Sequence, residues 1–121
     1  MIYSLSTASE LAALQARQGD VAQVFGRLEP GDGAWVYRWD SACTLPANGG
    51  TVWGQGGPGR WRLCHDGTVS LRCFGVFGPE MPADDALDAL VADGQVRTVR
   101  VDTDVDFARR HTFARSNVTL D

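Results

Sequence analysis

AWVYRWD, residues 34–40, is the stretch of this sequence that decides the fold. Its odd-numbered positions are all aromatic, and this two-residue period is typical of a half-buried β-strand, whose successive side chains point to opposite faces. Each aromatic ring buries on the order of 150–250 Å². We therefore expect a small β-domain with a core built mainly from aromatic rings. These rings belong to Trp35, Tyr37, Trp39, Trp53 and Trp61.

Short strand-favouring segments continue on both sides of this stretch, from Val21 to Leu71, and turn sequences separate them. The turns are rich in Gly, Pro, Asn and Asp, which suit the backbone angles of tight turns. They occupy residues 29–33, 46–50, 55–59 and 66–67. The pattern predicts a meander of β-hairpins, in which Asp66-Gly67 forms a two-residue hairpin turn.

A short helix is predicted before the meander. Residues 7–10, Thr-Ala-Ser-Glu, match a capping box, in which the Thr7 hydroxyl accepts a hydrogen bond from the backbone N–H of Glu10. We expect this helix to run to about Arg17, with Gly19 ending it.

A second helix is predicted over residues 83–93. Its apolar residues share one helical face, and Asp84 and Asp85 lie at its positive end. The apolar residues are Leu87, Leu90 and Val91. Three short strands are expected after it, around Val96–Val101, Val105–Phe107 and Val118–Leu120.

The composition is that of one globular domain, with 121 residues, 44% hydrophobic and 21% charged. Eleven basic residues against fifteen acidic ones give a formal charge of -4. This balance argues against duplex nucleic acid as a partner, because phosphate binding needs a concentrated positive face. The sequence contains no apolar run of about 18 residues and no signal-peptide pattern, so neither a membrane partner nor export by that route is expected.

Several motifs occur in an order that is found in one protein family. They are Gly31-Asp32-Gly33, Trp39-Asp40, Asn48-Gly49-Gly50, Gly59-Arg60-Trp61 and the segment 74–78 that leads to the helix at 84–90. In their order and spacing, residues 20–121 resemble the start of pectate-lyase-like right-handed β-helix proteins. That superfamily includes many phage tailspikes and polysaccharide depolymerases. The Pro-x-Gly-x-Tyr turn that follows the helix in the family is missing here.

Together with the pattern, the resemblance implies a mainly β fold with two short helices (α+β). A small β-meander module would be followed by a capping helix and by the first strands of a right-handed β-helix. We expect the N-terminal helix and the meander, an anchoring module, over residues 1–73. The capping helix and the incipient β-helix strands are expected over residues 74–121, packed with the first part as one compact unit.

The family continues into stacked coils where this sequence stops, and a solenoid coil cannot bury its apolar face alone. The resemblance therefore implies a structural virion protein rather than an enzyme, an anchoring or adaptor module of a phage tail spike or fibre. Its expected location is the virion tail, after synthesis in the host cytoplasm. The expected partners are further copies of itself, in a trimer, and other phage tail proteins. The alternative is a carbohydrate-binding module or a truncated depolymerase that recognises a host-surface polysaccharide.

Two groups of residues are candidates for contact with such partners. Trp35, Tyr37 and Trp39 are candidates for glycan stacking or for an interface, although their period favours packing in the core. The second group is a basic cluster with a neighbouring ring, which suits an acidic partner or a solvated turn. It consists of Arg109, Arg110, His111 and Phe113.

No catalytic residue, cofactor or metal is predicted. The acidic trio Asp102, Asp104 and Asp106 suits a solvated strand edge better than a cation site. Cysteines 43, 64 and 73 lack the paired spacing of a zinc site, and an odd, sparse set favours free thiols. A disulfide between Cys64 and Cys73 fits poorly, because a hairpin turn at 66–67 would place them out of register.

Overall fold

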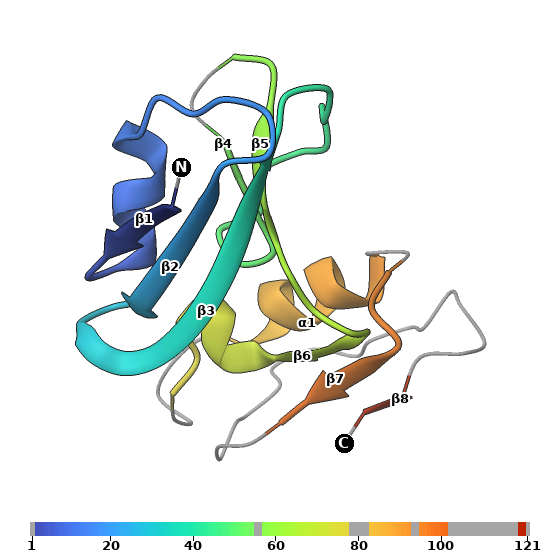
Figure 1. Ribbon diagram of the computed structural model, residues 1–121. Helices are drawn as coiled ribbons and strands as arrows, with labels where there is room; N and C mark the ends of the chain where they lie inside the picture. The colour runs from blue at the N-terminus through green and yellow to red at the C-terminus, as the bar shows by residue number, and fades with distance from the viewer. Residues whose placement is uncertain (1, 55–56, 78–82, 93–94, 102–118, 121) are drawn as a thin grey trace. The chain divides into compact units, whose positions relative to one another are not determined.

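The computed structural model describes residues 2–54, 57–77, 83–92, 95–101 and 119–120 (Figure 1). The chain divides into two compact units, Met1–Cys64 and His65–Asp121, called unit 1 and unit 2 below. The boundary predicted from the sequence, after Cys73, and the packing of both parts as one compact unit stay predictions. The predicted fold class, mainly β with two short helices, is confirmed.

Unit 1 is built on a five-stranded sheet with the strand order β1-β2-β3-β5-β4. The strands are β1 (Ile2–Leu5), β2 (Val21–Gly26), β3 (Pro30–Asp40), β4 (Val52–Gly54) and β5 (Arg60–Leu63). β1 runs parallel to β2, and the other neighbours are antiparallel. The stretch 34–40 lies in β3, as predicted. The sequence analysis missed β1, because four residues are too few to show a period.

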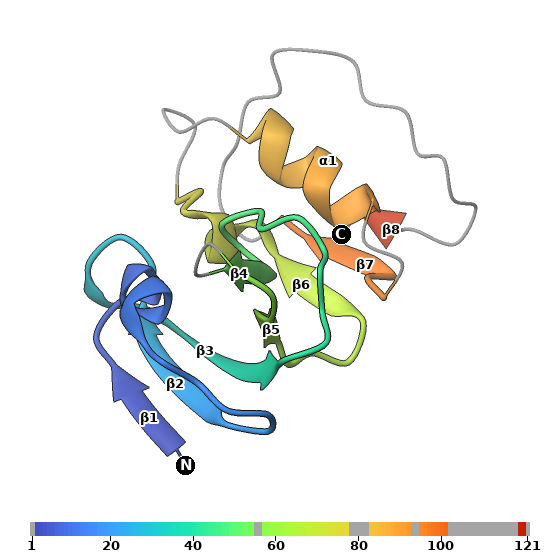
Figure 2. The same ribbon diagram turned by 90° about the horizontal axis from the view of Figure 1, so that it is seen from above.

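The core of unit 1 lies between this sheet and a 3₁₀-helix, η1 (Ala8–Ala13), which covers one face of the sheet (Figure 2). The side chains that point to this face alternate with exposed ones along β2 and the second half of β3, as the pleat of a β-strand requires. The buried cluster consists of Ala8, Leu11, Ala22, Val24, Tyr37, Trp39 and Trp61. It confirms the prediction of a core rich in aromatic rings.

The first predicted helix differs in type, length and capping. It is a 3₁₀-helix that ends at Ala13, and Leu14 already has extended backbone angles. The predicted capping box is wrong, because the Thr7 side chain makes no capping hydrogen bond. Its hydroxyl lies 3.1 Å from the hydroxyl of Ser9, and the Thr7 carbonyl accepts from the backbone N–H of Glu10 at 3.3 Å. That i to i+3 bond is typical of the tighter 3₁₀ turn.

The turn between β2 and β3 lies earlier than the Gly-Asp-Gly motif suggested. β3 begins at Pro30, so the chain reverses at residues 27–29. The Asp32 carboxylate holds this reversal, because it accepts backbone N–H groups from Arg27 at 2.6 Å, Leu28 at 3.0 Å and Glu29 at 3.0 Å. A carboxylate that bonds nearby backbone groups in this way stabilises a tight turn.

The Asn48-Gly49-Gly50 motif forms the predicted turn. The Asn48 side-chain oxygen accepts from the backbone N–H groups of Gly50 and Val52, at 2.9 and 3.0 Å. Gly49 has a φ of 75°, which favours glycine. The Arg27 guanidinium donates to the Gly49 carbonyl at 3.0 Å and lies over the Trp53 ring, 5.0 Å from its centroid. Arg27 thereby ties the Asn48 turn to β4.

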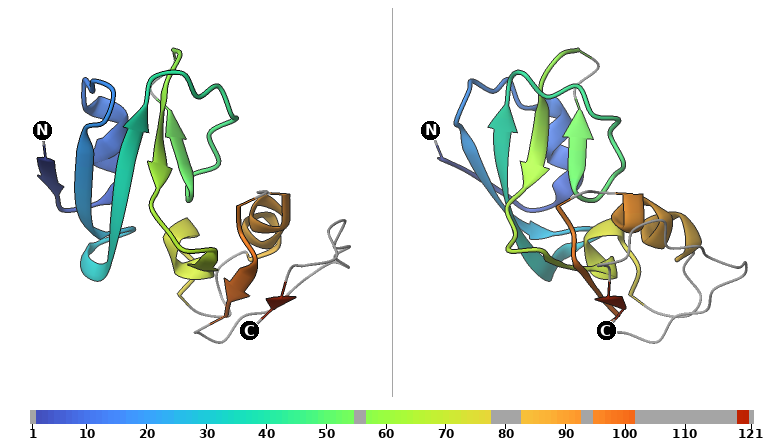
Figure 3. Two further views of the ribbon diagram at one scale, coloured as in Figure 1. Left: turned by 45° about the vertical axis from the view of Figure 1, so that its right-hand side comes forward. Right: turned by 90° about the vertical axis from the view of Figure 1, so that its right-hand side faces the viewer.

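Unit 2 contains a three-stranded sheet, all parallel, in the order β6-β7-β8. Its elements are β6 (Thr68–Ser70), the 3₁₀-helix η2 (Leu71–Phe74), α1 (Asp84–Ala92), β7 (Thr98–Arg100) and β8 (Thr119–Leu120). α1 packs against η2 and β7 (Figure 3). The predicted second helix is therefore confirmed, within the range expected for it.

The predicted hairpin at Asp66-Gly67 is wrong. β5 and β6 flank these residues but belong to different sheets, and β6 pairs with β7 instead. Gly67 has a φ of 108°, and its carbonyl accepts the backbone N–H groups of Arg97 and Thr98, at 2.7 and 2.9 Å. The turn thus directs the chain from one sheet to the other. None of the helices in the described part of the chain has both the length and the apolar character that crossing a membrane requires.

Candidate functional site

Tyr37, the central residue of the predicted aromatic row, is a core residue. Its side chain is fully buried, and its hydroxyl donates to the Gly50 carbonyl at 2.6 Å. A buried phenol normally finds such an acceptor. Tyr37 therefore ties the Asn48 turn to the centre of the sheet, and its ring face is not accessible to a sugar.

Trp39 is also a core residue. Its ring packs edge-on against Trp61, with centroids 5.5 Å apart and an interplanar angle of 68°, and its indole N–H donates to the Ser41 hydroxyl at 3.0 Å. Gly59 lies so close to the ring that a Cβ at this position would overlap it. The predicted core packing of Tyr37 and Trp39 is confirmed.

Trp35 differs from these two because it is half-buried and lies at the margin of the core.

The other two tryptophans, Trp53 and Trp61, are unusual in their hydrogen bonding. The indole N–H groups of Trp53 and Trp61 are buried and have no hydrogen-bond acceptor within the described residues. Trp61 is fully buried, and it faces Trp53 across the β4–β5 pair.

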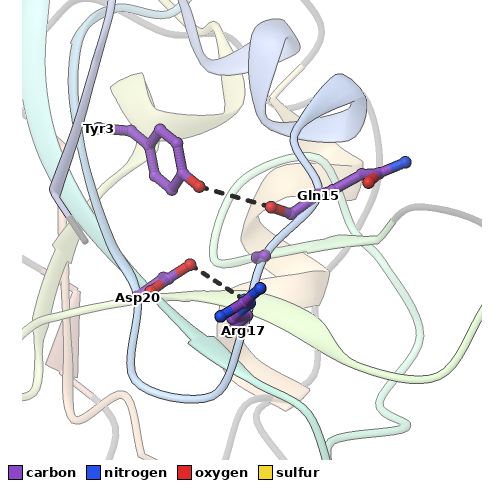
Figure 4. Close-up of a pocket in the computed structure, with 5 residues that line it drawn as sticks. Tyr3, Gln15, Arg17 and Asp20 are labelled. Carbon is purple, nitrogen blue, oxygen red and sulfur yellow. Dashed lines mark hydrogen bonds between the residues drawn. The ribbon is translucent and has the colours of Figure 1, made fainter.

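A polar hollow lies beside η1 in unit 1, at a place that the sequence analysis did not single out (Figure 4). Its volume is about 590 Å³. Figure 4 shows the Tyr3 hydroxyl directed at the Gln15 carbonyl, to which it donates at 3.5 Å. The lining residues are Tyr3, Gln15, Ala16, Arg17 and Asp20.

Asp20 is the acidic group of this hollow, and it is buried. The backbone N–H of Arg17 donates to its carboxylate at 3.0 Å. This hydrogen bond lowers the pKa of Asp20 below its usual value, against the opposing effect of burial. Asp20 is therefore ionised at neutral pH and suits a structural or cation-binding role better than that of a general acid.

The hollow depends on structure that local patterns do not reveal. Tyr3 comes from β1, whereas the other lining residues follow η1. They meet only because β1 pairs in parallel with β2. One signal in the sequence pointed to it, the Gly19-Asp20 pair before β2.

Of the remaining candidate residues, the cysteines lie in the described part of the chain and two other groups lie outside it. Cys43 and Cys73 are buried and Cys64 is exposed, and all three are free thiols. In the described ranges, no three His, Cys, Asp or Glu side chains are grouped so as to hold a metal ion. Two groups lie outside the described residues. These are the interface candidates Arg109, Arg110, His111 and Phe113, and the acidic trio Asp102, Asp104 and Asp106.

Comparison with known proteins gives a likeness of fold. No family model and no curated protein matches the sequence. Among solved structures, the chain is similar to the tailspike protein gp49 of Acinetobacter baumannii bacteriophage Fri1, a capsular polysaccharide depolymerase. The two share 17% sequence identity, with a TM-score of 0.69. The match covers 98% of this chain and 22% of the tailspike, so the chain spans about a fifth of that protein. The chain therefore has a fold that occurs within a phage tailspike.

Proposed function

We propose that this chain is a structural module of a phage tail, an anchoring or adaptor part of a tail spike or fibre that works as an oligomer, with three copies expected. The observation that carries the proposal is the fold likeness to a tailspike over 98% of the chain. A likeness that includes both units is more informative than one confined to a common β-sheet motif. The proposed role is mechanical, and the proposed location is the virion tail.

The sheet of unit 2 supports assembly. Parallel sheets occur almost always with both faces covered, and they form where strands from separate parts of a chain are brought together. Here the three parallel strands are two or three residues long. Within the described residues, β6 and β8 each have one side without a neighbouring strand. A short parallel sheet with open sides gains stability when other protein covers it.

The first test is the oligomeric state of the full chain. Light scattering on the purified protein at micromolar concentration should give three times the chain mass of 13.1 kDa. A monodisperse monomer would overturn the oligomeric part of the proposal. Location is tested separately with antibodies against the chain. They should label the tails of intact virions in electron micrographs, and label confined to the capsid would overturn the tail assignment.

The same preparation tests glycan recognition, the alternative suggested by the sequence. Of the three rings in the predicted row, only Trp35 is more than marginally exposed. If the chain binds host-surface polysaccharide, and Trp35→Ala abolishes binding while the protein stays folded, the chain is a carbohydrate-binding module. The anchoring proposal predicts that neither the unmodified chain nor the variant binds polysaccharide.

A further inference from the structure

The turn at residues 65–68, which opens unit 2, is held by two of its own side chains. The backbone N–H of Gly67 donates to Nδ1 of the His65 ring at 3.0 Å. The backbone N–H of Thr68 donates to the Asp66 carboxylate at 3.2 Å. Both bonds span two residues, which is the arrangement by which polar side chains stabilise a tight turn. Each of the two central peptide groups is therefore bonded to a side chain that precedes it.

The same turn positions the first residues of β7. The Gly67 carbonyl accepts the backbone N–H groups of Arg97 at 2.7 Å and of Thr98 at 2.9 Å. β7 then pairs with β6, where Thr98 lies opposite Thr68, and with β8 on its other side. Because β6 and β7 are only three residues long each, these two bonds are a large part of what holds the strands together. The order of the sheet thus depends on where the turn places the Gly67 carbonyl.

Gly67 gives this turn its freedom to open. Its φ of 108° lies in the region that favours glycine, and without a Cβ the neighbouring peptide groups rotate readily once a hydrogen bond is lost. Among the described residues, the His65 ring is the acceptor that fixes the peptide group before Gly67. A change at His65 therefore reaches β7 through a single glycine.

The His65 ring can make this hydrogen bond in only one charge state. An Nδ1 atom that accepts carries no proton, so the proton of the neutral ring is on Nε2. When the ring takes up a second proton, both nitrogens become donors, and the Nδ1–H and the Gly67 N–H then point at each other. Imidazole is the side chain that ordinarily changes charge between about pH 5 and pH 8. His65 is half-buried, so protons from solvent can reach it.

Two charged side chains belong to the turn and to the strand that it positions. Asp66 attracts a charged imidazole, whereas Arg97 repels it, and both are exposed, so solvent screens their effects. The hydrogen bond to Gly67 is therefore the contact that protonation changes most. The other charged residues in the described elements of unit 2 lie outside the turn. They are Arg72, Asp84, Asp85, Asp88 and Arg100.

From these contacts we propose that His65 is a pH-sensitive switch in the sheet of unit 2. The neutral ring holds the turn and, through Gly67, the start of β7. The protonated ring releases both. The signal that the switch reads is acidification, and its output is the order of the β6–β7 pair. This inference concerns the folding of unit 2 and does not rest on the proposed tail function.

The test is hydrogen exchange of the Arg97 and Thr98 amides in the full chain, followed by NMR and corrected for the intrinsic pH dependence of exchange. Their protection should fall about tenfold or more between about pH 7.5 and about pH 5.5, because the turn loses one hydrogen bond and weakens the two that depend on it. The Trp39 amide of unit 1, which donates to the Asp20 carbonyl at 2.8 Å, should keep its protection. Constant protection at Arg97 and Thr98 would overturn the switch.

Two variants of equal shape separate the acceptor from the charge. Asn places an amide oxygen where His has Nδ1 and does not titrate, whereas Leu has the shape of Asn without an acceptor. His65→Asn should keep the protection of both amides at both pH values, and His65→Leu should show the low protection throughout. If His65→Asn loses as much protection in acid as the unmodified chain, another group is responsible and the proposal fails. This comparison holds even where His65→Leu does not fold.

The matched control is His111→Asn, the same change at the other histidine of the chain. It should leave the pH dependence of the Arg97 and Thr98 amides as it is in the unmodified chain, and loss of that dependence would overturn the assignment to His65. The nitrogen-15 shifts of the His65 ring give an independent reading. At about pH 7.5 the unprotonated nitrogen should be Nδ1, and a protonated Nδ1 would remove the acceptor on which the switch depends.

Discussion

Unit 1 and unit 2 obtain their cores by different means. All four tryptophans and both tyrosines of the chain lie in unit 1, whereas unit 2 buries Val, Leu, Ala and Cys. A large ring buries much area from a single residue, and antiparallel neighbours need only short connections. Unit 2 instead joins three very short parallel strands through longer connections. The difference teaches that unit 1 has the means to hold its fold alone, while unit 2 is the part that gains most from partners.

The largest expected effect comes from the centre of unit 1. Trp61→Ala should lower the free energy of unfolding by about 3–5 kcal/mol, because a fully buried indole is lost and a cavity remains. Urea unfolding followed by the emission of the remaining tryptophans measures the change. Since every tryptophan lies in unit 1, this signal reports on unit 1 alone. A loss below about 1 kcal/mol would contradict the aromatic core.

The corresponding change in unit 2 is Leu90→Ala. Leu90 is fully buried on α1, so the cost should be about 2–5 kcal/mol. The loss should appear as earlier disappearance of the helical circular dichroism, while the midpoint of tryptophan emission stays in place. Coincident shifts of both signals would show that the two units unfold as one and would remove the contrast between them.

A glycine pair in unit 1 tests how tightly its core is packed. Gly59→Ala should cost about 2–4 kcal/mol, because Gly59 has a φ of 92° and an added Cβ would overlap the Trp39 ring. Gly57→Ala is the matched control, since nothing lies within 4 Å of its added Cβ. Thermal unfolding of both variants measures the two changes in stability. Equal stability would mean that the Trp39 ring has room to move.

The sequence did not reveal these packing details, although it predicted the strand and the turn on which they depend. The alternation at 34–40 and the Asn48 turn were predictable, because the signals are local and agree with the side chains that the fold buries. The predicted capping box failed because a 3₁₀ turn leaves the Thr7 hydroxyl without its amide partner. The wrong hairpin at Asp66-Gly67 failed because turn residues show that a chain bends, not which strands then pair.

The hollow and the cross-strand pairs were harder still to predict. The hollow around Asp20 depends on β1, which has no sequence period of its own. The pairing of Arg38 with Arg62 depends on the register between β3 and β5, two strands that pair although β4 lies between them in the sequence. Register is set by several strands together. Arg38 and Arg62 lie 24 residues apart in the sequence, so a local sequence pattern could not reveal that they are cross-strand neighbours.

The smallest expected effect concerns the turn that starts β3. Partial burial raises the pKa of Asp32, but the hydrogen bonds from Glu29, Arg27 and Leu28 lower the pKa by more, and the net pKa lies below its usual value. A carboxyl group with a lowered pKa stabilises the fold above its unfolded pKa, and this contribution is lost as the pH falls through the folded pKa.

Asp32→Asn should therefore cost about 1 kcal/mol at neutral pH, a modest value because the turn is only partly buried. Below about pH 4 the difference from the unmodified chain should shrink, as Asp32 itself becomes protonated. Urea midpoints of both proteins across this pH range measure the effect. A difference that stays constant down to acid pH would show that the charge of Asp32 does not hold the turn.

The unsatisfied indole of Trp61 gives this molecule a built-in spectroscopic reporter. A proton on a nitrogen that has neither an acceptor among the described residues nor access to solvent should resonate upfield of ordinary indole protons and exchange slowly with deuterium. One line in the correlation spectrum of nitrogen-15-enriched protein would then follow the entry of solvent into the centre of unit 1, with no extrinsic probe attached.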